Sequence, residues 1–128
     1  MSARIYVLVS IVVPLLLSPI SYAQQQLTGV YNGRIMVPAS GRNPRPIMIG
    51  ATLEVTSVEN GKVTGKWKNI SGDCRGDYEV SGSYQDNQFD LLTSAGALRG
   101  CGNAKLVLKV DGGKLVGKLN IYEVELSK

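Results

Sequence analysis

Hydrophobic and polar residues alternate with a period of two along most of the chain, and the breaks fall on Gly, Asn, Asp and Pro. This period is typical of β-strands, because successive side chains of a strand point to opposite faces. After residue 24 no segment shows the 3.6-residue stripe of a helix. The pattern predicts strands over residues 27–37, 47–58, 62–69, 78–84, 88–93, 104–110 and 114–126.

Short connections between these segments predict hairpins. Asn60-Gly61 and Asp111-Gly112 are dipeptides that accept the positive φ angles of tight primed turns, and 85–87 is equally short. In the last segment, 114–126, the alternate positions that we expect to face the barrel interior shift by one residue near Ile121. We interpret the shift as a β-bulge that bends one long strand, with two shorter strands as the alternative.

A weak internal repeat indicates how the sheet curls. Apolar, glycine and aromatic or apolar residues occupy alternate positions in four segments, 27–31, 63–67, 80–84 and 115–119. All three positions point to one face, and the central glycine leaves room for tight coiling. The sequence therefore predicts an all-β fold, a small antiparallel up-and-down β-barrel of about eight strands.

The N-terminal residues resemble a secretory signal peptide. Arg4 precedes an apolar run that is interrupted by Pro14 and Pro19, and small residues at Ser21 and Ala23 form a cleavage site. A membrane anchor is the competing interpretation, but the run falls short of the ~20 unbroken apolar residues that a span needs. We expect residues 1–23 to be a leader and residues 24–128 to form one barrel domain, secreted or periplasmic, with no stable membrane anchor after cleavage.

Charge and cysteine content limit the classes of function that the sequence allows. The formal net charge is +4, and loss of Arg4 with the leader lowers it to +3. Lysines are spread singly, so no basic stripe of a nucleic-acid binder is present. Cys74 and Cys101 are the only cysteines, and in an exported protein they predict a disulfide bond. Because His and a CxxC motif are absent, zinc lacks its usual ligands, and we expect no metal site. We also expect no cofactor.

The opening of the predicted barrel, residues 27–32 with the sequence Leu-Thr-Gly-Val-Tyr-Asn, resembles the calycin superfamily of avidins, lipocalins and secreted bacterial inhibitor barrels. The resemblance implies an eight-stranded barrel that holds a ligand in its mouth or presents loops to a partner. Asn32 falls where avidins have a polar ligand to the ureido group of biotin, so the resemblance would imply a biotin contact there. This chain has a single tryptophan, Trp67, and lacks the serine expected shortly after Asn32, so the architecture is carried over and biotin is not.

Catalytic chemistry has little support in the sequence. Without His, and with both cysteines oxidised, no usual nucleophile and base are available. The carboxylate pairs Asp73 with Asp77 and Glu123 with Glu125 fit solvated surface charges better than acid and base.

Arginines are the strongest candidates for binding, because they recognise anions with a planar, bidentate group. A disulfide would bring Arg75 close to Arg99, although Asp73 and Asp77 could neutralise both in surface ion pairs. Arg42 and Arg45 lie in the proline-rich connection 38–46, which is either a partner-binding loop or a solvated linker.

Aromatic side chains on the predicted inward face provide a second candidate set. Core packing explains them, and a ligand cavity would use the same residues. The candidates are Tyr31, Trp67 and Tyr84.

The leading functional hypothesis is a non-enzymatic binding protein. Its partner would be a small ligand or an extracellular protein and not nucleic acid, and the arginines favour an anionic partner. The alternatives are a small enzyme that acts on an anionic or glycan substrate, and a proteinaceous inhibitor that presents residues 42–46 to an extracellular enzyme.

Overall fold

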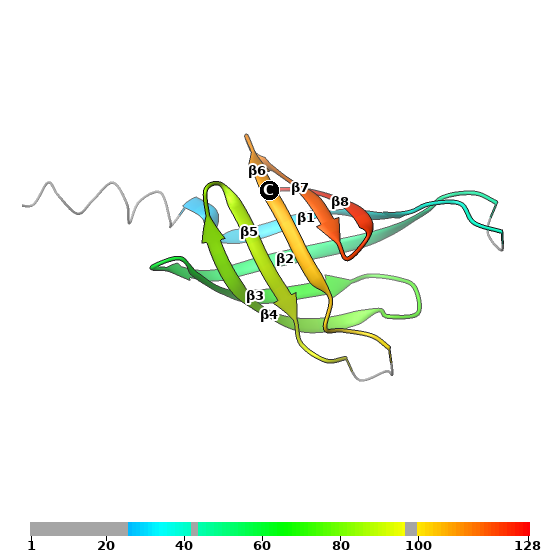
Figure 1. The fold of residues 1–128 in the computed structure, drawn as a ribbon, viewed down its shortest axis with the longest axis horizontal. Coiled ribbons are helices and arrows are strands. Elements are labelled where there is room, and N and C mark those ends of the chain that lie inside the picture. Colours follow the sequence, from blue (N-terminus) through cyan, green and yellow to red (C-terminus); the bar gives the residue numbers. More distant parts are fainter. Residues whose placement is uncertain (1–25, 42–43, 97–99) are drawn as a thin grey trace, which may run out of the picture.

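Eight strands pair in chain order and close into an antiparallel barrel (Figure 1). They are β1 (Gly29–Val37), β2 (Ile47–Glu59), β3 (Lys62–Asn69), β4 (Gly76–Gln85), β5 (Gln88–Thr93), β6 (Lys105–Asp111), β7 (Lys114–Leu119) and β8 (Tyr122–Ser127). β8 pairs with β1 from Asn32 opposite Ser127 to Met36 opposite Glu123, which closes the barrel. The computed structural model describes residues 26–41, 44–96 and 100–128, so the predicted leader lies outside the described residues. The predicted all-β barrel is confirmed.

Turn chemistry sets the strand boundaries. Asn60 and Gly61 adopt φ angles of 52° and 79°, and Asp86 and Asn87 adopt 54° and 62°, as primed two-residue turns require. The connection between β6 and β7 is the pair Gly112-Gly113, one residue later than the predicted Asp111-Gly112 turn, with Gly112 at φ 64°. The hairpins predicted at these three places are therefore confirmed.

The interpretation of residues 114–126 as one bent strand is wrong. These residues form the hairpin of β7 and β8, with Leu119 opposite Tyr122. Asn120 takes a φ of 54°, and Asn tolerates this left-handed conformation better than most residues. The phase shift near Ile121 therefore marks a turn, whereas the register shift that the strands do contain lies in β2, between Val55 and Ser57.

Side chains from all eight strands fill the barrel with one apolar cluster. Trp67, Phe89, Leu53, Leu106 and Leu108 are among its largest members, each no more than 1% exposed. Burial at this level is the main source of stability of so small a domain. Among the described residues, five of the seventeen buried hydrophobic core members occupy positions of the sequence repeat, namely Tyr31, Val63, Trp67, Val80 and Leu115.

Two glycines of the repeat show why the barrel is narrow. A Cβ atom on Gly65 would overlap the Glu54 carbonyl oxygen of β2, and one on Gly117 would overlap the Val107 carbonyl oxygen of β6. Backbones of neighbouring strands approach at these points more closely than any other residue allows. The glycines thus permit the tight coiling predicted from the repeat.

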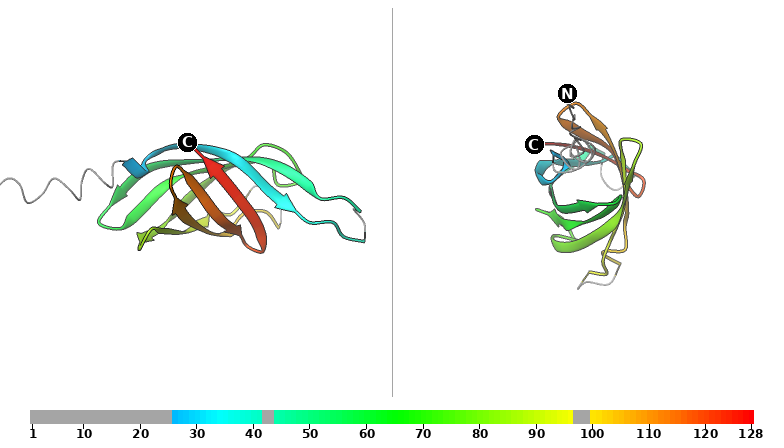
Figure 2. Two further views of the ribbon diagram at one scale, coloured as in Figure 1. Left: turned by 90° about the horizontal axis from the view of Figure 1, so that it is seen from above. Right: turned by 90° about the vertical axis from the view of Figure 1, so that its left-hand side faces the viewer.

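The two ends of the barrel differ. The turn end carries the three two-residue connections 60–61, 86–87 and 112–113. The opposite end, here called the loop end, carries the connections 38–46, 70–75 and 94–104 and the turn 120–121. The paired ends of β1 and β2 project beyond the other strands at the loop end (Figures 1 and 2).

Candidate functional site

Barrel topology settles a question that the sequence left open, because the connections that precede β2, β4 and β6 all lie at the loop end. Arg45 and Arg75 are exposed there. Arg42 and Arg99 lie outside the described residues. Within the ranges that the structure covers, the one ion pair joins Lys114 to Glu125, at 3.5 Å. Arg75 therefore does not form the surface ion pair with Asp73 or Asp77 that was the alternative to binding.

A disulfide bond fastens two of the loop-end connections together. Cys74 and Cys101 are bonded, with their Cα atoms 5.4 Å apart, as the sequence predicted. The Cys74 carbonyl oxygen accepts hydrogen bonds from the Tyr78 hydroxyl at 2.6 Å and from Asn69 Nδ2 at 3.0 Å. The Trp67 indole N–H in turn donates to Asn69 Oδ1 at 2.7 Å. The backbone beside Arg75 is therefore held rigidly, which reduces the entropy lost when it binds a partner.

Asn69 links the buried core to the disulfide-bonded connection, because its side chain bonds both the Trp67 indole and the Cys74 carbonyl oxygen. Asn69-Ile70-Ser71 also has the form of a glycosylation sequon. We expect Asn69→Ala to lower the free energy of unfolding by about 1–3 kcal/mol, because it leaves the buried Trp67 indole N–H without its acceptor. Ser71→Ala, which destroys the sequon and leaves both hydrogen bonds of Asn69 intact, is the control. Urea denaturation of both variants measures the difference, and equal stabilities would contradict the structural role of Asn69.

Exposed aliphatic side chains accompany the arginines. Seven large hydrophobic residues of the described chain are exposed, and four belong to the loop-end connections or to the first two residues of β2. These four are Ile47, Met48, Ile70 and Ile121. Sequence reasoning missed them. For Ile47 and Met48 the available signal was composition, because residues 24–53 contain three arginines and no Lys, Asp or Glu.

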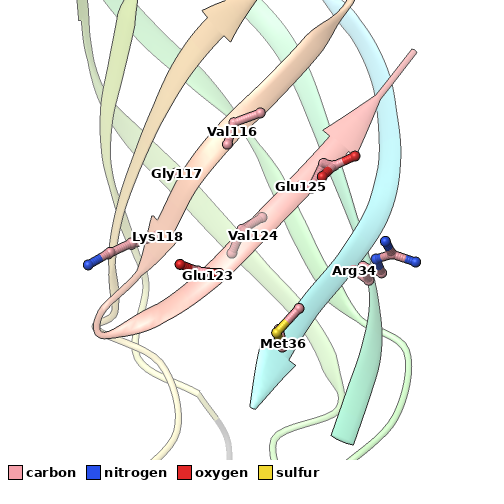
Figure 3. A pocket seen from close by; sticks show the side chains of 8 residues that line it. All are labelled: Arg34, Met36, Val116, Gly117, Lys118, Glu123, Val124 and Glu125. Carbon is pink, nitrogen blue, oxygen red and sulfur yellow. The ribbon is translucent and has the colours of Figure 1, made fainter. Parts of the chain in front are cut away.

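A groove of about 320 Å³ crosses the outer surface over β1, β7 and β8 (Figure 3). Met36 and Val116 supply apolar walls. Charged side chains of both signs border it, namely Arg34, Lys118, Glu123 and Glu125. Since these charges balance, the groove itself does not select an anion.

Tyr31 and Trp67 belong to the buried core, and Tyr84 packs against it. Trp67 is 1% exposed, with its indole N–H bonded to Asn69. Tyr84, near the turn end, packs on Phe89 with ring centroids 4.9 Å apart. Tyr31 donates its hydroxyl to the Leu27 carbonyl oxygen at 2.8 Å. Burial raises the pKa of Tyr31 above 10.0, and the Tyr84 charge adds to the effect. The structure thus gives each of these three side chains packing or hydrogen-bond contacts within the protein.

Among the described residues, no cluster of three or more His, Cys, Asp or Glu side chains is placed to hold a metal ion. No helix formed by the described residues is long and apolar enough to cross a membrane. Comparison of the chain with protein-family models, curated proteins and solved structures finds no match. The site is therefore interpreted from its own geometry.

Proposed function

We propose that the chain is an exported, non-enzymatic binding protein that holds an anionic partner at the loop end of its barrel. One observation carries the proposal: the interior is occupied by buried side chains, while Arg45 and Arg75 are exposed at one end of the barrel without an ion pair to another described residue, Arg75 on a connection that the disulfide bond ties down. A filled core leaves the surface for recognition. Guanidinium groups in such a setting suit carboxylates or phosphates.

The disulfide is consistent with a secreted or periplasmic location, because such bonds persist in oxidising compartments. We propose accordingly that residues 1–23 are a cleaved leader. We also propose a calycin-like barrel, supported by the closed eight-stranded meander and by the opening residues 27–32.

An inhibitor of an extracellular enzyme is the second candidate. The projection of the β1 and β2 ends beyond the barrel favours it, because a protruding hairpin can enter a concave active site (Figure 2). Both candidates use the same end of the molecule and the same type of partner chemistry.

Neutralising the arginines tests the proposal. Residues 24–128 with Arg42, Arg45, Arg75 and Arg99 all changed to Gln should bind immobilised poly-glutamate at least tenfold more weakly than the unchanged protein at low salt, where charge attraction is least screened. Thermal stability should hardly change, because exposed charges contribute little to folding.

The matched control removes four exposed lysines of β3, β6 and β7 and so makes the same change in net charge. It consists of Lys62, Lys66, Lys109 and Lys114 changed to Gln. Equal loss of binding in the two variants would show a general charge effect and would contradict a site at the loop end.

A further inference from the structure

The projecting ends of β1 and β2, residues 36–37 and 47–48, form what we call the arm. On its outer face Met36 lies opposite Met48. Ile70 extends this apolar face, because a Cβ built on Gly50 would be 3.2 Å from Ile70 Cδ1. Met48 is 48% and Ile70 57% exposed. The arm therefore presents a continuous apolar surface to solvent.

One edge of the arm is open. Pairing of β2 with β3 ends at Ala51 opposite Asn69, and the last backbone bond on that side runs from the Ile70 N–H to the Gly50 carbonyl oxygen at 2.9 Å. Hydrogen-bonding groups alternate sides along a strand. The Met48 N–H and C=O therefore point to the open side, where the described residues provide no partner.

The open edge is short. Pro46 is the next residue before Met48 whose backbone groups would point to the open side. Proline has no N–H, so the edge ends there. Prolines at an edge restrict uncontrolled strand pairing. What remains is an edge over residues 47–49, bounded by Pro46 and by the bonded Gly50.

Composition indicates what kind of surface this is. Protein interfaces are enriched in Met and Arg and depleted of Lys, Glu and Asp. Residues 24–53 follow that bias, with two methionines, three arginines and none of the depleted residues. Charge complementarity then requires an acidic partner, and the open edge requires an extended one.

We infer that the open edge of the arm is a docking strand for a partner protein, which adds a short extended segment with an apolar centre and acidic flanks. Strand addition would satisfy the Met48 backbone groups, the apolar centre would cover the methionine surface, and the flanking carboxylates would meet Arg45 and Arg75. The inference rests on the proposed function and specifies the class of partner.

The test uses three synthetic heptapeptides and fluorescence polarisation. The probe has a Val-Ile-Val centre between pairs of glutamates, since the open edge spans three residues. One control peptide replaces the centre with three serines, and the other replaces the glutamates with lysines. We expect the probe to bind residues 24–128 at least tenfold more tightly than either control.

Variants locate the binding. Met48→Pro removes the outward N–H, and the double variant Met36→Ser with Met48→Ser removes the apolar surface without touching the backbone. Both should weaken probe binding at least tenfold. Leu92→Ser, which removes a side chain that is 53% exposed on β5, should leave binding unchanged.

Other outcomes overturn the inference. Equal binding of the serine-centred peptide would show recognition of charge alone. Failure of the probe to bind a protein that still binds poly-glutamate would remove the docking strand and leave the proposed function standing, whereas failure of both ligands would remove both. A third outcome concerns membranes. If the unchanged protein sedimented with phosphatidylglycerol vesicles but bound no peptide, and the double serine variant did not sediment, the arm would be assigned to a lipid surface.

Discussion

Replacing Cys74 and Cys101 with serine is expected to lower the free energy of unfolding by about 3.5 kcal/mol. The bond closes a loop of sequence separation 27, and the estimate follows from the chain entropy that such a loop removes from the unfolded state. For a domain of this size the melting temperature should fall by roughly 15–25 °C. Differential scanning calorimetry of residues 24–128 and of the double serine variant measures the change.

Reduction of the unchanged protein provides the control for this prediction. Adding a thiol reductant should reproduce the stability of the double serine variant, because both treatments remove the same link. A melting temperature that neither treatment moves would contradict a stabilising role for the disulfide. In that case the β3–β4 and β5–β6 connections would be held by hydrogen bonds alone.

Trp67→Ala is expected to have an effect of similar size, about 3–5 kcal/mol of lost stability. The side chain is fully buried, and its removal would leave a cavity and an Asn69 oxygen without its donor. Trp67→Phe fills most of the space and loses only the hydrogen bond, so it should cost less. Circular dichroism in urea compares the two.

The phenylalanine variant keeps this prediction testable even where the alanine variant fails to fold. If Trp67→Ala were as stable as the unchanged protein, Trp67 would not be a packing residue. A role for Trp67 in an internal ligand cavity would then regain support.

Local sequence signals predicted the strand connections well at turns that only a few residue types can form. Asn60-Gly61 predicted its hairpin because both residues tolerate positive φ angles. Asn120 was missed because no glycine follows it, although it adopts the same backbone region. Its neighbour Ile121, which is 77% exposed, was read as part of a strand.

Much of the candidate site depends on closure of the barrel and is invisible to local reasoning. The disulfide was predictable from two cysteines, but the common end of Arg45 and Arg75 follows only from the strand order. The surface of Met36, Met48 and Ile70 requires the register of β1 with β2 and the path of the chain after β3. No pattern within one segment contains that information.

The central claim, that binding occurs at the loop end and not in the interior, is tested most directly by NMR. Residues 24–128 labelled with ¹⁵N would be titrated at low salt with a short poly-glutamate. We predict that the largest amide shift changes fall at residues 45–49 and 70–76, while the amides of the fully buried residues Leu53 and Leu108 stay in place. Largest changes at Leu53 and Leu108, or at the turn end around Tyr31, would contradict the claim.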